Sequence, residues 1–258
     1  MEKAIRTILN ISLSALLIFA AAKFTLNERD NKLNRQECAE ALQIALSQTE
    51  AKAPASETPA KLPDDPISLE LLAMDMEALQ AENKDVIGWI YVPDSKINYP
   101  LLQAEDNSFY LNHSWKQSPN AAGAIFMDCK NRADFSQFNT IIYGHNIMAG
   151  DMFASLHSYR NPDYLQRHPS VYIRSGNSVL RFDVYAAQLA GARSIVYGLN
   201  IESEQNKEAF LNYVQASNSL EAHTEDSFLT LSTCADGNNK KRMVVIAVLN
   251  EENSYIDF

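Results

Sequence analysis

The chain has few of the features that mark nucleic-acid-binding proteins, metal proteins or disulfide scaffolds. Its 258 residues carry a formal net charge of −10 and no long basic run, whereas binding to nucleic acid by counterion release needs a basic surface. There are only three cysteines, with no CxxC pair and no zinc-ligand spacing, and no acidic stretch follows a calcium-loop pattern. We therefore expect no metal, no cofactor and no nucleic-acid partner.

The sequence also lacks an apolar run that spans a bilayer comfortably. The uncharged stretch 7–22 has 16 residues, and a spanning helix needs about 20. Small residues at 20–22 would suit signal peptidase, and cleavage there would give a secreted protein. We favour an uncleaved anchor with its basic end in the cytoplasm, because the segment that follows resembles a stalk.

Three segments are expected along the chain. Residues 1–23 form the anchor, 24–66 form a helical stalk and proline-rich linker, and 67–258 form the folded domain. The linker includes 51–66, which carries four prolines and is predicted to be a semi-stiff spacer. Apolar residues of the stalk recur three or four apart, as on one helix face: Cys38, Ala41, Leu42 and Ala45.

The folded domain is predicted to be mainly β. Asp65 and Pro66 suit a helix start, and the apolar residues that follow would form one stripe of that helix: Leu69, Leu72, Met76 and Leu79. Eight runs rich in β-branched and aromatic residues come next: 86–93, 97–103, 123–128, 139–145, 170–175, 178–191, 228–234 and 242–249. Eight strands in a region of about 170 residues favour a closed eight-stranded barrel with peripheral helices.

Helical patterns interrupt the strands at 151–160 and 202–217. The second pattern lies in a connection of roughly 35 residues between the sixth and seventh runs, far longer than ordinary loops. We expect this connection to form a wall of a substrate site.

One free thiol stands at the end of the seventh run. The odd number of cysteines leaves at least one unpaired, and alternation places Cys234 on a polar face with Ser232. A polar turn, 235–241, leads to Arg242, and an antiparallel return would bring its guanidinium near the sulfur. A fixed cation favours a thiolate, and arginine can donate hydrogen bonds to an oxyanion. Cys129 is expected to be a small buried residue.

A proton carrier is available among the five histidines. His145 ends the fourth run as Cys234 ends the seventh, so both would open onto one barrel rim. The other four histidines are expected at the surface. Because histidine exchanges protons near neutral pH, it suits acyl transfer by cysteine.

These residues resemble the signature of the class B sortases. The motifs are TLSTC ending at Cys234, YGHN containing His145, and RMVVIAVL starting at Arg242, and the resemblance covers about 65–249. It implies a cysteine transpeptidase on a Gram-positive surface, held by a single-pass anchor with its catalytic domain outside the cytoplasm. Such an enzyme cleaves a C-terminal sorting signal after its Thr, holds the product as a thioester, and transfers it to an amine of peptidoglycan or a pilin.

The resemblance also implies residue roles. Cys234 would be the nucleophile, His145 the general acid, and Arg242 the group that steadies substrate and oxyanion. Four positions would line the groove for the signal peptide: Asn107, Leu111, Ser232 and Tyr197.

From the residues alone, two other interpretations stay open. A secreted thiol peptidase would release the thioester with water, although papain-like enzymes place their cysteine at the start of a helix and Cys234 ends a predicted strand. A non-catalytic binding module displayed on a stalk would make the Cys, His and Arg arrangement coincidental.

Overall fold

The computed structural model describes residues 2–47, 63–147, 150–198, 201–214, 216–217, 219–234 and 241–256, and it describes Cys234 by its backbone. Most of the predicted spacer 51–66 and of the predicted turn 235–241 lies outside these residues.

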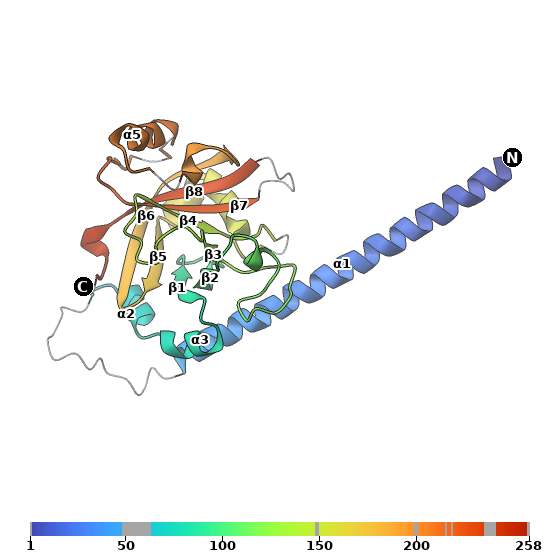
Figure 1. Cartoon of the computed structure of the whole chain (residues 1–258), viewed down its shortest axis with the longest axis horizontal. Coiled ribbons are helices and arrows are strands. Elements are labelled where there is room, and N and C mark those ends of the chain that lie inside the picture. Colours follow the sequence, from blue (N-terminus) through green and yellow to red (C-terminus); the bar gives the residue numbers. More distant parts are fainter. Residues whose placement is uncertain are drawn as a thin grey trace.

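Eight strands close into a barrel, which confirms the predicted fold class (Figure 1). The order around the barrel is β1-β2-β3-β4-β7-β8-β6-β5, and β5 pairs with β1 to close it. Two neighbouring pairs are parallel, β2 with β3 and β4 with β7, and the others are antiparallel. The strands are β1 (Val86–Tyr91), β2 (Asn98–Leu102), β3 (Phe126–Met127), β4 (Asn139–Tyr143), β5 (Ser170–Ser175), β6 (Ser178–Gly191), β7 (Phe228–Cys234) and β8 (Lys241–Leu249).

Alternating side chains fill the barrel. Leu229 and Leu231 of β7 are fully buried in one apolar cluster with Ile142 of β4 and Val245 of β8. Burying such a side chain contributes roughly 1.5–3 kcal/mol relative to leaving it exposed. Leu229 and Leu231 therefore line the inner face of β7, opposite to the predicted polar face that carries Ser232.

The long connection between β6 and β7 covers the outer face of β7. It contains the 3₁₀ turn η3 (Ile195–Tyr197) and helix α5 (Glu204–Tyr213), which is shorter than the predicted 202–217. Phe210 of α5 packs on Phe228 with ring centroids 5.1 Å apart. Thr230 and Ser232, which face outward from β7, are buried, and Ser232 is hydrogen-bonded to Tyr197 of this connection.

The predicted single helix after Pro66 is two helices. α2 (Pro66–Leu72) is capped by Asp65, which accepts hydrogen bonds from the Ile67 and Ser68 amides. The prediction of one apolar stripe is wrong because Asp75 accepts from the Ala78 amide and starts α3 (Met76–Glu82) anew. Leu69 consequently remains 41% exposed.

Short helical segments occupy the remaining connections. The predicted helix 151–160 is the 3₁₀ segment η2 (Ala154–Arg160), and the short helix α4 (Pro162–Arg167) follows it. Two further 3₁₀ segments are η1 (Phe109–Leu111) and η4 (Glu251–Asn253).

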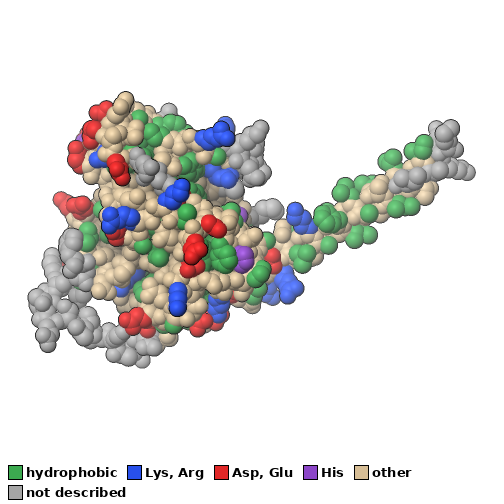
Figure 2. All heavy atoms as spheres, in the orientation of Figure 1, with side chains coloured by type: hydrophobic (Ala, Val, Ile, Leu, Met, Phe, Trp, Pro, Cys, Tyr) green, Lys and Arg blue, Asp and Glu red, His purple; other side chains and the backbone are tan. Residues whose placement is uncertain are grey.

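Helix α1 (Glu2–Leu46) has two halves with different surroundings. The N-terminal half projects from the barrel (Figure 1). It carries exposed hydrophobic side chains (Figure 2). Among the described residues, α1 alone is long and apolar enough to cross a membrane. Its C-terminal half packs on the barrel with Ala41 and Ala45 fully buried, which confirms the predicted amphipathic face.

Candidate active site

The ends of three adjacent strands bring the predicted chemical residues to one rim. In the parallel pair of β4 and β7, Tyr143 lies opposite Ser232, and His145 and Cys234 each follow two residues later. The Gly144 amide donates to the Ser232 carbonyl at 3.1 Å, so the pairing continues past the end of β4. Across the next pair, Cys234 lies directly opposite Arg242. Adjacent strands lie about 4.8 Å apart, so these three positions are neighbours.

The His145 ring is held by the main chain. Its Nε2 lies 2.6 Å from the Leu111 carbonyl oxygen, and because a carbonyl oxygen only accepts, Nε2 carries the hydrogen. The proton that converts His145 to imidazolium therefore goes to Nδ1. On the other side, the His145 carbonyl accepts a hydrogen bond from the Phe153 amide at 3.0 Å. The half-buried residue is thus held at two points, one on its ring and one on its backbone carbonyl.

Gly123 forms a close wall beside His145. Its φ is +63°, and a Cβ added there would lie 2.8 Å from His145 Cδ2 and 2.6 Å from the Tyr110 carbonyl oxygen. Both distances are shorter than packed carbon and oxygen atoms tolerate. The position therefore requires glycine for its backbone conformation and for the space that the imidazole occupies.

Two of the predicted groove residues meet across a long stretch of sequence. The Tyr197 hydroxyl lies 2.8 Å from Ser232 Oγ in a hydrogen bond. The Tyr197 ring also stacks on Tyr143, with centroids 6.5 Å apart and planes at 11°. The connection between β6 and β7 therefore reaches the strand end that leads to Cys234.

The other two groove residues lie in the connection between β2 and β3. Asn107 donates to Asp128 Oδ2 at 2.8 Å and accepts from the Cys129 amide at 2.8 Å, so its amide group is anchored. The Leu111 side chain is 45% exposed, while its carbonyl binds His145.

Asp128 and Tyr143 are structural contributors that the sequence patterns did not single out. Asp128 is buried and accepts hydrogen bonds from both Asn107 and the Tyr143 hydroxyl. Burial and then the Asp128 charge raise the pKa of Tyr143, so this hydroxyl stays a donor. Asp128 thereby joins the Asn107 side of the site to the Tyr143–Tyr197 stack.

The remaining histidines are not all at the surface, contrary to the prediction. His168 is 3% exposed, and its two ring nitrogens lie 2.8 Å from the Tyr164 carbonyl and 3.0 Å from the Asp94 carbonyl. It is a buried structural residue because α4 and the turn after β1 enclose it. Across the described part of the chain, no group of three or more His, Cys, Asp or Glu residues is arranged to hold a metal ion.

Known proteins share this fold and sequence. A family model described as the sortase domain matches residues 90–250. Sortase B of Listeria monocytogenes is 35% identical over 180 residues, covering 66% of this chain and 72% of that protein. A solved sortase B structure from that organism matches with a TM-score of 0.61 and 35% identity, over 68% of this chain and 100% of the other. A Staphylococcus aureus sortase B structure matches with a TM-score of 0.64 and 28% identity, over 70% of this chain and 87% of the other.

The barrel and these matches define a cysteine transpeptidase associated with the membrane at the cell surface. The chain belongs to the sortase family and, through these relatives, to class B. The resemblance noted in the sequence is confirmed at the level of family, class and fold.

Proposed function

We propose that Cys234 is the nucleophile of this sortase, His145 its general acid and Arg242 its oxyanion donor. The observation that supports this assignment is the strand register. His145 follows the end of β4, while Cys234 lies in β7 and Arg242 in β8, and these three strands are adjacent in the barrel. The register of the strand pairs places the three residues side by side. Residues directly opposite in an antiparallel pair project to the same sheet face, which favours an arginine next to the sulfur.

The substrate we propose is a C-terminal sorting signal. The Cys234 thiolate attacks the carbonyl carbon of the signal's Thr, and Arg242 donates to the oxyanion that forms. His145 gives a proton to the departing amide nitrogen as the C–N bond breaks, which leaves a thioester. An incoming amine then attacks the thioester, its excess proton passes to His145, and Cys234 leaves again as the thiolate.

The groove for the signal would lie between two connections. Asn107 and Leu111 come from the connection between β2 and β3, and Tyr197 comes from the connection between β6 and β7. Ser232 lies between them on β7 and is hydrogen-bonded to Tyr197. Since peptide-binding sites combine apolar contacts with a few placed polar groups, the exposed Leu111 side chain and the anchored Asn107 amide suit this role.

The partners we propose are surface proteins that carry the signal and an acceptor amine of peptidoglycan or a pilin. The N-terminal half of α1 would hold the enzyme in the membrane by a single pass, with the barrel outside the cytoplasm, because its apolar side chains are exposed and the basic residues Lys3 and Arg6 lie at its start. We propose the division into anchor (1–23), stalk and linker (24–66) and catalytic domain (67–258), with the end of α1 docked on the barrel.

The amine requirement is a direct test of transpeptidation. The full-length protein in detergent micelles would be given a set of candidate signal peptides, with and without a diglycine amine donor, and products would be identified by mass. We expect cleavage after Thr and a product containing the added amine at saturating donor. Exclusive formation of the free acid at every donor concentration would instead identify a thiol peptidase.

A further inference from the structure

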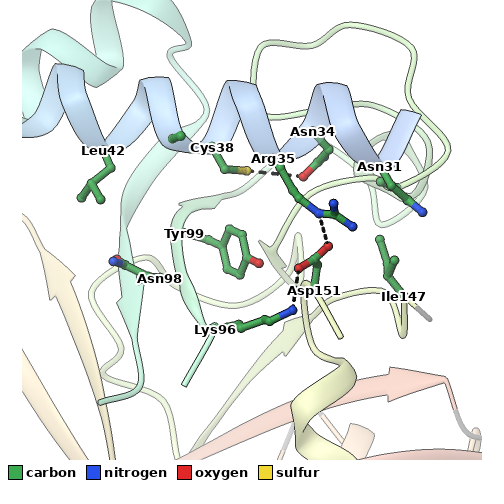
Figure 3. A pocket seen from close by; sticks show the side chains of 12 residues that line it. Asn31, Asn34, Arg35, Cys38, Leu42, Lys96, Asn98, Tyr99, Ile147 and Asp151 are labelled. Carbon is green, nitrogen blue, oxygen red and sulfur yellow. Dashed lines mark hydrogen bonds and ion pairs between the residues drawn. The ribbon is translucent and has the colours of Figure 1, made fainter. Parts of the chain in front are cut away.

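Helix α1 touches the barrel on both flanks of His145. Asn34 of α1 donates to the Gly123 carbonyl at 2.7 Å, and Gly123 is the residue that packs against the His145 ring. One residue later, Arg35 Nε donates to Asp151 Oδ2 at 2.6 Å (Figure 3). The helix that leads to the membrane therefore contacts the wall beside His145 and the hairpin that follows it.

Asp151 lies on the return limb of the hairpin that starts at His145. Asn146 and Met152 form an antiparallel bridge between the two limbs, and the Phe153 amide donates to the His145 carbonyl at 3.0 Å. Asp151 precedes Met152 directly. A shift of Asp151 would therefore pass to the His145 backbone through two neighbouring main-chain contacts.

Polar contacts join α1 to this hairpin. A cavity of about 170 Å³ lies here, and its lining includes Cys38 of α1, Tyr99 of β2, and Ile147 and Asp151 of the hairpin (Figure 3). Lys96 also reaches Asp151, at 3.4 Å, so two cations share one carboxylate that is 15% exposed. The hydrogen bond to Asp151 and the charge of that carboxylate raise the pKa of Arg35, so the guanidinium stays protonated.

We propose that Arg35 is a positioning residue for His145, so that the membrane-linked helix completes the active site of the barrel. Arg35 fixes Asp151 and thus the hairpin after His145, while Asn34 fixes Gly123 on the other side of the ring. A misplacement of about 1 Å can slow a reaction by about 10²-fold. The proposal rests on the proposed role of His145 as general acid.

The first test compares variants of the full-length protein in micelles. Arg35→Gln should lower kcat about tenfold and leave KM within about twofold, since the groove residues are not touched. Because half-exposed ion pairs contribute little stability, the Tm should fall by less than about 3 °C. Arg35→Lys should recover most of the lost rate.

A matched control comes from the same helix. Glu40 accepts from Lys116 at 2.6 Å in a second ion pair between α1 and the barrel, and this pair does not touch the His145 hairpin. Glu40→Gln should therefore leave kcat unchanged. An equal loss of kcat in Glu40→Gln and Arg35→Gln would show that docking of the helix alone matters, and would overturn the proposal.

A double-mutant cycle separates this proposal from the function on which it rests. In a His145→Ala background, Arg35→Gln should change the single-turnover rate by less than about twofold, because no imidazole remains to be positioned. A tenfold loss in both backgrounds would overturn the positioning role. If His145→Ala itself leaves the rate unchanged, the proposed function fails instead, and the positioning proposal falls with it.

Discussion

Replacement of His145 by alanine is expected to slow acylation of the enzyme by about 10²–10⁴-fold, the usual contribution of a general acid. Without the imidazole, the departing amide nitrogen has to leave without a proton from the enzyme. The ring is half-buried and makes a hydrogen bond to the Leu111 carbonyl, and it belongs to none of the apolar core clusters, so the fold should persist. Single-turnover release of the amine fragment from an internally quenched signal peptide measures the effect.

The matched control for this variant is His223→Ala. His223 is exposed and lies shortly before β7, at the end of that strand opposite to Cys234. Its replacement should leave the acylation rate within about twofold, since it lies outside the rim. Full activity of His145→Ala together with a folded structure by circular dichroism would exclude His145 as the proton donor.

Gly123→Ala is expected to have the second large effect. The added Cβ would meet the Tyr110 carbonyl at 2.6 Å, His145 Cδ2 at 2.8 Å and the Leu111 carbonyl at 3.0 Å. Either the imidazole turns away or the backbone that carries Leu111 moves, and both break the bond that orients His145. We expect a loss in kcat of about 10–100-fold.

Gly176→Ala separates displacement of His145 from backbone strain. Gly176 also has a positive φ, +52°, but an added Cβ there meets nothing within 4 Å. Both variants should lose roughly 1–2 kcal/mol of stability from the left-handed backbone, measured by denaturant unfolding. Only Gly123→Ala should lose activity. Equal kcat values for the two variants would contradict the role of Gly123 as a wall for His145.

The strands and the rim could be predicted because their signals are local. Short runs rich in β-branched and aromatic residues marked all eight strands. The predicted antiparallel return from the seventh run to the eighth placed Arg242 near Cys234, and the register of β7 and β8 pairs these two residues. His145 was expected at the same rim as Cys234 because each residue ends a predicted strand. The parallel register of β4 and β7 that brings His145 level with Cys234 is a non-local pairing, which the sequence pattern does not encode.

Other features were missed because backbone groups leave no signature in the residue pattern. The Leu111 carbonyl that orients His145 belongs to a main chain that every residue shares. Similarly, the amphipathic half of α1 was recognisable from its spacing, but its docking surface was not. The restart of a helix at Asp75 was overlooked because apolar spacing continued across the break, while the side-chain cap decided the structure.

The residue that carries the acyl group shows which thiol is the nucleophile. Wild-type enzyme would be mixed with a cleavable signal peptide without an amine donor, quenched in acid, digested, and analysed by tandem mass spectrometry to locate the acyl group. We expect a thioester on Cys234 alone. Burial raises the pKa of Cys38 to about 12, so at neutral pH its thiol stays protonated and unreactive. Peptide cleavage accompanied by acylation of Cys38 or Cys129, or by no covalent adduct under any quench, would contradict this expectation.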